Sequence, residues 1–469
     1  MNKLLYLPME IASRELDSRL LLSVIALTYG FEVVIGQKWL IESNIKRMPP
    51  GIYLSKTMTR RDAERLKKAR ARGYFTAAID EELPGIITKP EELRWIAEEA
   101  VAETEAIFIG GDGNLQSFTS RFPDAKARVI KALNPRWDLL RTTFRSLFDE
   151  EVARIRAAHG DDFVLINTNL GFINSEKGDK DAILKEQIRL GKLDLNNAEH
   201  MAYVTSIVEM ERANRAAILE IVARLRREHP ERVVVIRPHP SERLAPWIEA
   251  FQDDPKVQVI REGSAVPWIL ASALLIHTNC TTGTEAIVLG KPTICVLPTD
   301  SAVLRRYLSN RVNPVTRSVD ETLALAGRIL ENPGRSVYTS EMLDQFHKAM
   351  SFEDDRLGAQ IIIEHLVEVV ERRGGFSRRR PAVSAWSPDS KYRWHIPDKN
   401  VRGELFPSLD RNAVTRRLQK IVKALGIDLS PEVEYCGSKV LLIGNHRMRP
   451  FVRFRRSLAG AFCDFRTGT

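Results

Sequence analysis

Short apolar runs alternate with amphipathic stretches along the first 135 residues of the chain. Four apolar runs predict strands: KLLYLP, FEVVIG, FTAAID and AIFIGG. Three stretches with apolar side chains at helical spacing lie between them, at residues 14–29, 59–73 and 91–103. Strands that alternate with helices in this way form a parallel sheet covered on both faces. The pattern therefore predicts one α/β domain over residues 1–150.

The same rhythm restarts after a charged helical segment, DEEVARIRAAHGDD. A strand, FVLINTN, and a long helix at residues 198–228 come first. Four further predicted strands follow: RVVVIRP, VQVIR, LLIHTN and PTICVLP. Helical stretches at residues 340–354 and 356–373 end the pattern. We therefore expect two Rossmann-like, doubly wound α/β domains in tandem, the second over residues 151–373.

The last part of the chain departs from this pattern. The segment RRGGFSRRRPAVSAWSPDS is rich in Gly, Ser, Pro and Arg, so residues 374–469 are expected to form a linker and a small basic C-terminal extension. The net charge of the chain is +9, and residues 378–469 hold 19 Lys and Arg against 8 Asp and Glu. Two interpretations have equal weight: a solvated basic surface, and a surface that docks on the anionic inner face of the cytoplasmic membrane.

Composition narrows the class of protein. Hydrophobic residues make up 44% of the chain and charged residues 28%, which is typical of a soluble globular protein and excludes collagen-like, disordered and disulfide-scaffold classes. The apolar runs end well before the roughly 20 residues that a membrane-spanning helix requires. The four cysteines form no C-x-x-C pair, which favours reduced thiols and a cytoplasmic location.

A histidine between two prolines follows the most apolar strand of the second domain. Val233 to Ile236 favour a buried strand, and Pro238 and Pro240 prevent its continuation. His239 is thereby held on a stiff loop at the carboxyl end of a strand, where doubly wound sheets bind their ligands. Arg237 adds positive charge that stabilises a leaving phosphate. Taken alone, His239 is equally well explained as a loop histidine satisfied by the backbone.

A cluster of hydroxyl groups follows the strand LLIHTN. Thr281, Thr282 and Gly283 stand at the start of a predicted helix, where free backbone N–H groups and the helix dipole bind phosphate. Glu285, just inside this helix, is a candidate for binding the two hydroxyls of a ribose. Simple N-capping by the threonines is the alternative. Because this cluster and His239 both follow strands of one sheet, we expect them to converge on one cleft.

Four spaced motifs resemble those of a known family. LNPRWDLLR, INTNLGFIN, RPHPSE and HTNCTTGTEAIVLGKPTI resemble the motifs of the bacterial surface carbohydrate biosynthesis proteins, which are similar to glycosyltransferases of the GT-B fold. The resemblance covers about residues 1–370. His-Pro motifs also occur in capsule Kdo transferases and bacterial sialyltransferases, which use CMP-sugars, and in teichoic-acid glycerophosphotransferases, which use CDP-glycerol.

The resemblance implies a set of nucleotide contacts. His239 and Pro240 would face the donor phosphate, Thr281 and Thr282 would cradle it, and Glu285 would bind the ribose. The full expected set is Arg237, His239, Pro240, Ser241, His277, Asn279, Thr281, Thr282, Gly283 and Glu285. The backbone of residues 262–265 is expected to contact the cytosine base, whereas Trp268 is expected in the core.

An inverting transfer also needs a general base from the N-terminal domain. CMP-sugar transferases place two acids directly before a glycine in this role, and here Leu83 and Pro84 separate Glu81 and Glu82 from Gly85. Glu81 and Glu82 are the candidates, and an acidic turn beside a helix is the alternative.

The acceptor side of the site is expected in the same domain. The turn IGGDGN lacks the spacing of a dinucleotide site, so Asp112 is a reserve base facing the acceptor. Asn134 and Arg136 are expected near the domain junction. There Arg136 either meets an anionic acceptor or pairs with a surface acid. Neither a metal nor a cofactor is expected, because the helix dipole and His239 offset the phosphate charge.

These features favour a metal-independent glycosyltransferase of surface polysaccharide biosynthesis. It is expected to transfer a sugar with inversion from CMP-Kdo or a CMP-nonulosonate to a glycan or lipid-linked acceptor, in the cytoplasm or on the inner membrane face. The enzymatic alternatives are a CDP-glycerol-type glycerophosphotransferase and an enzyme like the UDP-sugar 2-epimerases. The non-enzymatic alternative is a nucleic-acid binder driven by the basic tail, although no nucleic-acid partner is expected.

Overall fold

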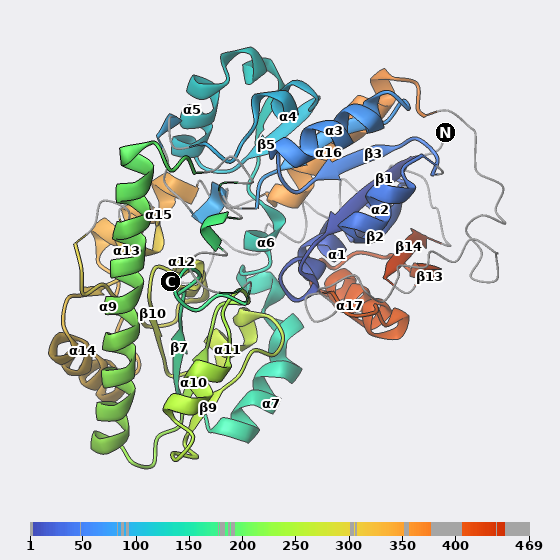
Figure 1. The fold of residues 1–469 in the computed structure, drawn as a ribbon. Coiled ribbons are helices and arrows are strands. Elements are labelled where there is room, and N and C mark those ends of the chain that lie inside the picture. Colours follow the sequence, from blue (N-terminus) through green and yellow to red (C-terminus); the bar gives the residue numbers. More distant parts are fainter. Residues whose placement is uncertain are drawn as a thin grey trace. The chain divides into compact units, whose positions relative to one another are not determined.

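The computed structural model describes residues 3–46, 48–81, 83–85, 89–90, 93–176, 178, 183–185, 188, 193–300, 304, 307–350, 356–376, 406–437 and 439–445. The described chain divides into two compact units. Unit 1 draws on residues 1–84, 89–147 and 350–469, and unit 2 draws on residues 85–88 and 148–349. Each unit is a sheet with helices packed around it (Figure 1).

The sheet of unit 1 has eight strands. Their order is β13 (Pro431–Gly437), β14 (Val440–Asn445), β2 (Glu32–Gln37), β1 (Leu4–Met9), β3 (Ile52–Ser55), β4 (Phe75–Ile79), β5 (Ala106–Ile109) and β6 (Val129–Lys131). The strands from β2 to β6 pair in parallel, whereas the β13–β14 hairpin is antiparallel and adds to the sheet beside β2. Every residue of β1, β3, β4 and β5 is buried, as expected for strands covered on both faces.

Helices connect and cover the strands of unit 1. They are α1 (Ala12–Thr28), α2 (Lys38–Asn44), α3 (Arg60–Arg70), α4 (Glu98–Ala102), α5 (Asp112–Arg121), α6 (Pro135–Asp138), α16 (Gly358–Arg372) and α17 (Arg411–Ala424). Short 3-10 turns span Leu83–Gly85 (η1), Pro123–Arg128 (η3) and Thr142–Phe148 (η4). The start of α3 is encoded locally, because the Asp62 carboxylate accepts the Thr59 backbone N–H at 2.9 Å, one half of a capping box.

Helix α16 belongs to unit 1, although its place in the sequence suggests that it ends the second domain. Its first backbone N–H groups, those of Gly358 and Ala359, donate to the two carboxylate oxygens of Asp138 at 3.0 and 2.8 Å. Asp138 is the last residue of α6 and lies 220 residues earlier in the chain than Gly358. α16 also packs against α1. The residues that anchor this helix are therefore distant in sequence, and hydrophobic periodicity alone does not reveal them.

The described part of the basic C-terminal extension is also integral to unit 1. β14 pairs with β2, and α17 packs against α1 (Figure 1). The Arg417 guanidinium forms an ion pair with the Asp17 carboxylate at 2.6 Å, and the side chains of Leu418 and Ile421 are buried. Residues 406–437 and 439–445 thus complete a sheet and a helical layer, and several of their basic side chains lie on a folded surface. The linker predicted over residues 377–405 lies outside the described residues.

Unit 2 holds a six-stranded parallel sheet. Its order is β12 (Val315–Thr316), β11 (Thr293–Val296), β10 (Leu274–His277), β7 (Val164–Asn167), β8 (Val234–Arg237) and β9 (Val257–Val259). Its helices are α7 (Asp149–His159), α9 (Ala198–Glu228), α10 (Ala245–Ala250), α11 (Ala265–Ala271), α12 (Thr281–Leu289), α13 (Ser309–Val312), α14 (Val319–Glu331) and α15 (Ser340–Met350). The strand order reverses around β7, so the loops after β7, β8 and β10 meet at the switch point of the sheet.

The expected fold class is confirmed: the chain forms two Rossmann-like α/β units of the GT-B type. Sequence patterns missed β3, β6, β12 and the β13–β14 hairpin, because strands of two to four residues give little periodic signal and the hairpin follows an unclassified segment. Within the described ranges, no helix is both long enough and apolar enough to cross a bilayer.

Candidate functional site

Three loops converge at the carboxyl edge of the sheet of unit 2, as the sequence predicts. The loop after β7 contacts the loop after β10, where the Asn169 side-chain amide donates to the Asn279 carbonyl at 3.2 Å. It also contacts the loop after β8, where Ser175 and Glu242 form an isolated antiparallel bridge. The two motifs singled out in the sequence, around His239 and Thr281, therefore flank one site built on the loop after β7.

Glu242 holds two of these loops together. Its buried carboxylate accepts the Thr168 hydroxyl at 2.8 Å, the backbone N–H of Leu170 at 3.0 Å and that of His239 at 3.1 Å. The indole N–H of Trp247, on α10, donates to it at 3.2 Å. Burial raises the pKa of Glu242, while these donors oppose the rise. Glu242 stands within the quoted motif RPHPSE, yet sequence analysis assigned it no role, because its partners come from three separate segments.

His239 is oriented by a neighbour in its own loop. Its Nδ1 lies 2.7 Å from the Ser241 hydroxyl oxygen and accepts the Ser241 backbone N–H at 3.2 Å. Because a backbone N–H can only donate, Nδ1 is an acceptor, and the neutral ring carries its proton on Nε2. Both the backbone and the ring of His239 are thus held in place, and the imidazole is only half-buried.

Arg237 braces the loop that follows β9. Its guanidinium donates to the carbonyls of Glu262 at 2.7 Å and Gly263 at 3.2 Å, and it lies 4.8 Å from the ring centre of Trp268. Burial lowers its pKa to about 10, so it remains charged at neutral pH. Arg237 therefore positions the backbone that the sequence predicts to contact the base. Trp268 is buried in the core, as expected.

The start of α12 is not capped by its N-cap side chain. The N-cap residue is Cys280, which makes no side-chain capping bond, so the structure contradicts simple N-capping by the threonines. The preceding residue, Asn279, has a positive φ of 39°, an uncommon conformation that tends to occur at functional sites. The side-chain oxygens of Thr278, Asn279 and Thr282 are buried and have no hydrogen-bond partner among the described residues. Of these oxygens, the Thr282 hydroxyl can donate to an anion, whereas Asn279 Oδ1 can only accept and Thr278 has no exposed surface. The positive end of the helix dipole and the Thr282 hydroxyl therefore suit this terminus to an anionic ligand.

His277 and Gly283 have packing roles that differ from the nucleotide contacts predicted for them. The His277 side chain is fully buried, and burial lowers its pKa to about 3, so the ring is neutral. A Cβ atom at Gly283 would lie only 2.2 Å from His277 Nε2. Gly283 is thus required because α12 passes directly over the imidazole. A side chain with no exposed surface cannot contact a ligand, so His277 supports the site from beneath.

Glu285 and Thr281 lie in the first turns of α12, as predicted. Glu285 is 5% exposed, and Thr281 is half-buried. The ribose contact of Glu285 and the phosphate contact of Thr281 and Pro240 stay predictions.

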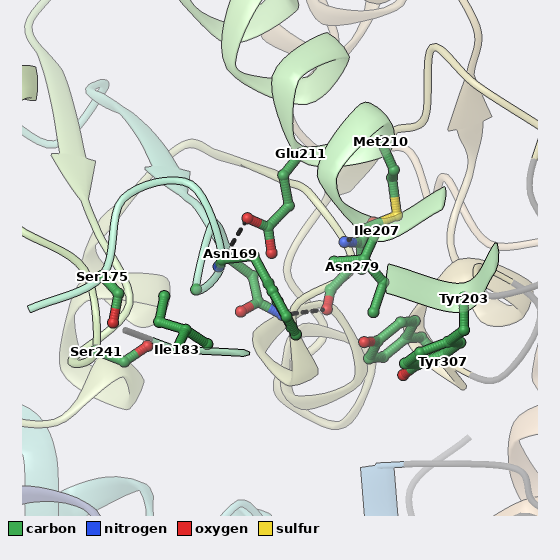
Figure 2. Close-up of a pocket in the computed structure, with 12 residues that line it drawn as sticks. Asn169, Ser175, Ile183, Tyr203, Ile207, Met210, Glu211, Ser241, Asn279 and Tyr307 are labelled. Atoms are coloured by element: carbon green, nitrogen blue, oxygen red, sulfur yellow. Dashed lines mark hydrogen bonds between the residues drawn. The ribbon is translucent and has the colours of Figure 1, made fainter. Parts of the chain in front are cut away.

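A pocket of about 280 Å³ adjoins these loops. In Figure 2, Ser175 and Ser241 lie at one end, Tyr203 and Tyr307 at the other, and Glu211 and Asn169 between them. Glu211 comes from α9 and accepts the backbone N–H groups of Phe172 and Ile173 at 2.9 Å each. Burial raises its pKa to about 7, and the nearby Glu242 charge adds to the rise. Sequence analysis missed Glu211. It could have been noticed as an acidic residue on the otherwise apolar face of a long amphipathic helix.

Of the two candidate bases in unit 1, Glu81 is described and Glu82 lies outside the described residues. The Glu81 carboxylate is buried and forms an ion pair with Arg19 at 2.7 Å. Burial alone would raise the pKa of Glu81, but the charges of Arg19 and Arg14 outweigh it and lower the pKa to about 2. A carboxylate with so low a pKa accepts a proton poorly, so this geometry favours a structural role for Glu81.

The predicted acceptor-side residues of unit 1 make an ion pair, a helix cap and a contact with an aromatic ring. Asp112 begins α5 and pairs with Lys131 at 2.8 Å, with 64% of its side chain exposed. Asn134 caps α6 by accepting the Arg136 backbone N–H at 2.9 Å. The Arg136 guanidinium lies 5.6 Å from the ring centre of Trp137. Their contact with an acceptor stays a prediction.

Buried charges gather at the carboxyl edge of the sheet of unit 1, and sequence analysis missed them. Lys56, which follows β3, pairs with Glu15 at 2.6 Å and with Glu10 at 3.0 Å. Lys38, which follows β2, pairs with Asp62 at 2.7 Å. Among the described residues, no group of three or more His, Cys, Asp and Glu side chains is arranged to hold a metal ion.

Comparison with known proteins supports the fold. No protein-family model and no curated protein matches the chain. The structure is similar to that of the wall teichoic acid polymerase TagF soaked with CDPG, with 11% identity and a TM-score of 0.50 over 79% of this chain and 89% of that one. It also matches S. aureus MnaA in a UDP co-structure (12% identity, TM-score 0.46, 79% and 97% of the two chains) and the Methanocaldococcus jannaschii UDP-GlcNAc 2-epimerase (13% identity, TM-score 0.46, 78% and 100%). At such low identity, the likeness to TagF establishes the two-unit α/β fold alone.

Proposed function

We propose that this protein is an enzyme that uses a nucleotide-activated sugar in the biosynthesis of surface polysaccharide. The observation that carries the proposal is the uncapped start of α12, where the buried Thr282 hydroxyl has no partner among the described residues. His239, held by Ser241 on the loop after β8, belongs to the same group of converging loops. The positive end of a helix dipole beside an oriented imidazole is suited to the phosphate of a nucleotide.

Within this class, we propose an inverting glycosyltransferase with CMP-Kdo or a CMP-nonulosonate as donor. The acceptor hydroxyl would form the new glycosidic bond as the bond between the sugar and the phosphate oxygen breaks, and CMP would leave. The charge that develops on the departing phosphate would be stabilised by the α12 terminus and by the Nε2–H of His239. The acceptor would be a glycan or a lipid-linked glycan.

The acceptor hydroxyl must lose its proton to a base. The ion pair with Arg19 makes Glu81 a poor base, so Glu82 becomes the first candidate and Asp112 the reserve. Two alternatives share the same phosphate site: a CDP-glycerol-type glycerophosphotransferase and a UDP-sugar 2-epimerase-like enzyme. A nucleic-acid binder that relies on the basic tail would need none of the residues around α12.

Calorimetric binding of CMP, CDP, UDP and UMP tests the proposal. We expect one nucleotide to bind selectively, and His239→Ala to weaken its binding by roughly tenfold or more, because a hydrogen bond to a charged group is lost. His229→Ala is the matched control, since His229 lies at the end of α9 that leads to the amino end of β8. CMP selectivity supports the CMP-sugar transferase, whereas preference for CDP or for UDP supports one of the enzymatic alternatives. If none of the four binds, the proposal fails.

The basic tail offers a second test, because we propose that it docks the protein on anionic membrane. Residues 406–437 and 439–445 complete unit 1, so a deletion that tests docking must spare them and remove only residues 446–469. That segment has six Arg and one Asp. We expect the deletion to reduce co-sedimentation with phosphatidylserine vesicles at low salt, since each basic residue contributes about 1 kcal/mol of attraction. Binding equal to that of the full chain contradicts docking, and neutral phosphatidylcholine vesicles are the control.

A further inference from the structure

We propose that the pocket between α9 and the loop after β7 holds the hydroxyl-bearing group that the nucleotide carries, a sugar or a glycerol, and that the Glu211 carboxylate accepts a hydrogen bond from one of its hydroxyls. This inference rests on the proposed function and names the part of the substrate that the pocket recognises.

The pocket continues directly from the phosphate site. Ser241, which lines one end of the pocket, is the residue that orients His239. Asn279, which lines it near the middle, is the positive-φ residue just before the uncapped start of α12. A phosphate bound at α12 would therefore present its attached group to this pocket. The two sites share residues, so one ligand can occupy both.

The wall of the pocket combines aromatic rings with polar groups. Tyr203 and Tyr307 offer ring faces at one end, and Ser175 and Ser241 offer hydroxyls at the other (Figure 2). Aromatic faces pack against the C–H surface of a polyol, while hydroxyls and amides bind its O–H groups. At about 280 Å³ the pocket is slightly smaller than the usual ligand-site range of roughly 300–1,000 Å³, which suits one sugar ring better than a complete nucleotide-sugar.

Glu211 is the charged group of this pocket. One carboxylate oxygen accepts both N–H groups of the β7 loop, those of Phe172 and Ile173. The other oxygen points toward Asn169 across the pocket (Figure 2). Burying a carboxylate is costly, and the backbone N–H groups of the β7 loop, to which Gly171 also contributes, compensate only part of that cost. The pKa of about 7 reflects this incomplete compensation. A ligand hydroxyl donating to the second oxygen would add to this compensation.

The experiment separates recognition of the carried group from the anchoring of the loop. The carbonyl oxygen of Gln accepts the same two backbone N–H groups, so Glu211→Gln keeps the anchor and loses the charge. Binding is measured by calorimetry at pH 8 for three pairs of compounds: CMP and CMP-sialate, CDP and CDP-glycerol, UDP and UDP-GlcNAc. Glu209→Gln, an exposed position on the same helix, is the control.

For the nucleotide that binds, we expect its conjugate to bind more tightly in the wild type. Glu211→Gln should reduce this advantage by roughly tenfold, the worth of one hydrogen bond to a charged group, and leave the affinity for the free nucleotide unchanged. Ile207→Phe, which narrows the pocket, should abolish the advantage in the same way. The inference is overturned if the conjugate has no advantage in the wild type, or if the advantage survives both substitutions. If no nucleotide binds at all, the proposed function itself has failed.

Discussion

Gly358→Ala is expected to lower the free energy of unfolding of unit 1 by about 3 kcal/mol or more. A Cβ atom at Gly358 would lie 2.0 Å from the backbone oxygen of Leu133, and backbone cannot move aside as a flexible side chain does. The first turn of α16 would have to shift, and the backbone N–H groups of Gly358 and Ala359 would lose the buried Asp138 carboxylate. One methyl group would thus separate α16 from its anchor on α6.

Urea unfolding and hydrogen exchange of the α16 amides measure this effect. Gly327→Ala is the matched control, because it lies within α14 of unit 2 and an added Cβ there would meet nothing within 4 Å. The control should be neutral or stabilising by up to about 1 kcal/mol. If the α16 amides exchange as slowly in Gly358→Ala as in the wild type, the close approach of Gly358 to Leu133 does not determine the stability of α16.

Glu81→Gln is expected to destabilise unit 1 by about 3–5 kcal/mol, because it leaves the charge of buried Arg19 uncompensated. Arg19 has no exposed surface, and its Nε and Nη1 atoms have no partner among the described residues, which makes Glu81 its main compensation there. Glu103→Gln is the control: its pair with Arg70 is exposed and should contribute less than about 1 kcal/mol.

A double-mutant cycle identifies the cause. In an Arg19→Met background no buried charge remains to be compensated, so Glu81→Gln should cost much less there than in the wild type. If Glu81 were instead the catalytic base, Glu81→Gln would abolish turnover without changing stability, and the cycle would show no coupling. That result would restore the role that the sequence suggested for Glu81.

The same ion pair predicts a dependence of stability on pH. The pKa of Glu81 falls from its ordinary value of 4.5 to about 2 in the folded protein. A lowered pKa stabilises the fold above the unfolded value, and this contribution, about 3 kcal/mol, is lost as the pH falls from 4.5 toward 2. Glu81→Gln should flatten the stability profile in this window, as measured by urea unfolding at successive pH values.

The sequence by itself determined the fold class and the loops that bear the candidate site. Strands that alternate with helices require a parallel sheet with both faces covered, and such a sheet binds ligands at the carboxyl ends of its strands. Pro238 and Pro240 end β8 through their own covalent geometry, so the loop position of His239 was predictable. The helical start at Thr281 was predictable for the same reason, since its signals are local.

The tertiary structure alone decided the roles that depend on distant partners. α16 joins unit 1 because Asp138, far earlier in the chain, caps it. His277 lies beneath Gly283 instead of facing a ligand, and Glu81 pairs with Arg19, which lowers its value as a base. Glu211 gained its raised pKa only when α9 packed against the loop after β7. Residue type and periodicity record what a side chain can do, but burial and partners, which decide its charge and its contacts, arise only when separate segments pack together.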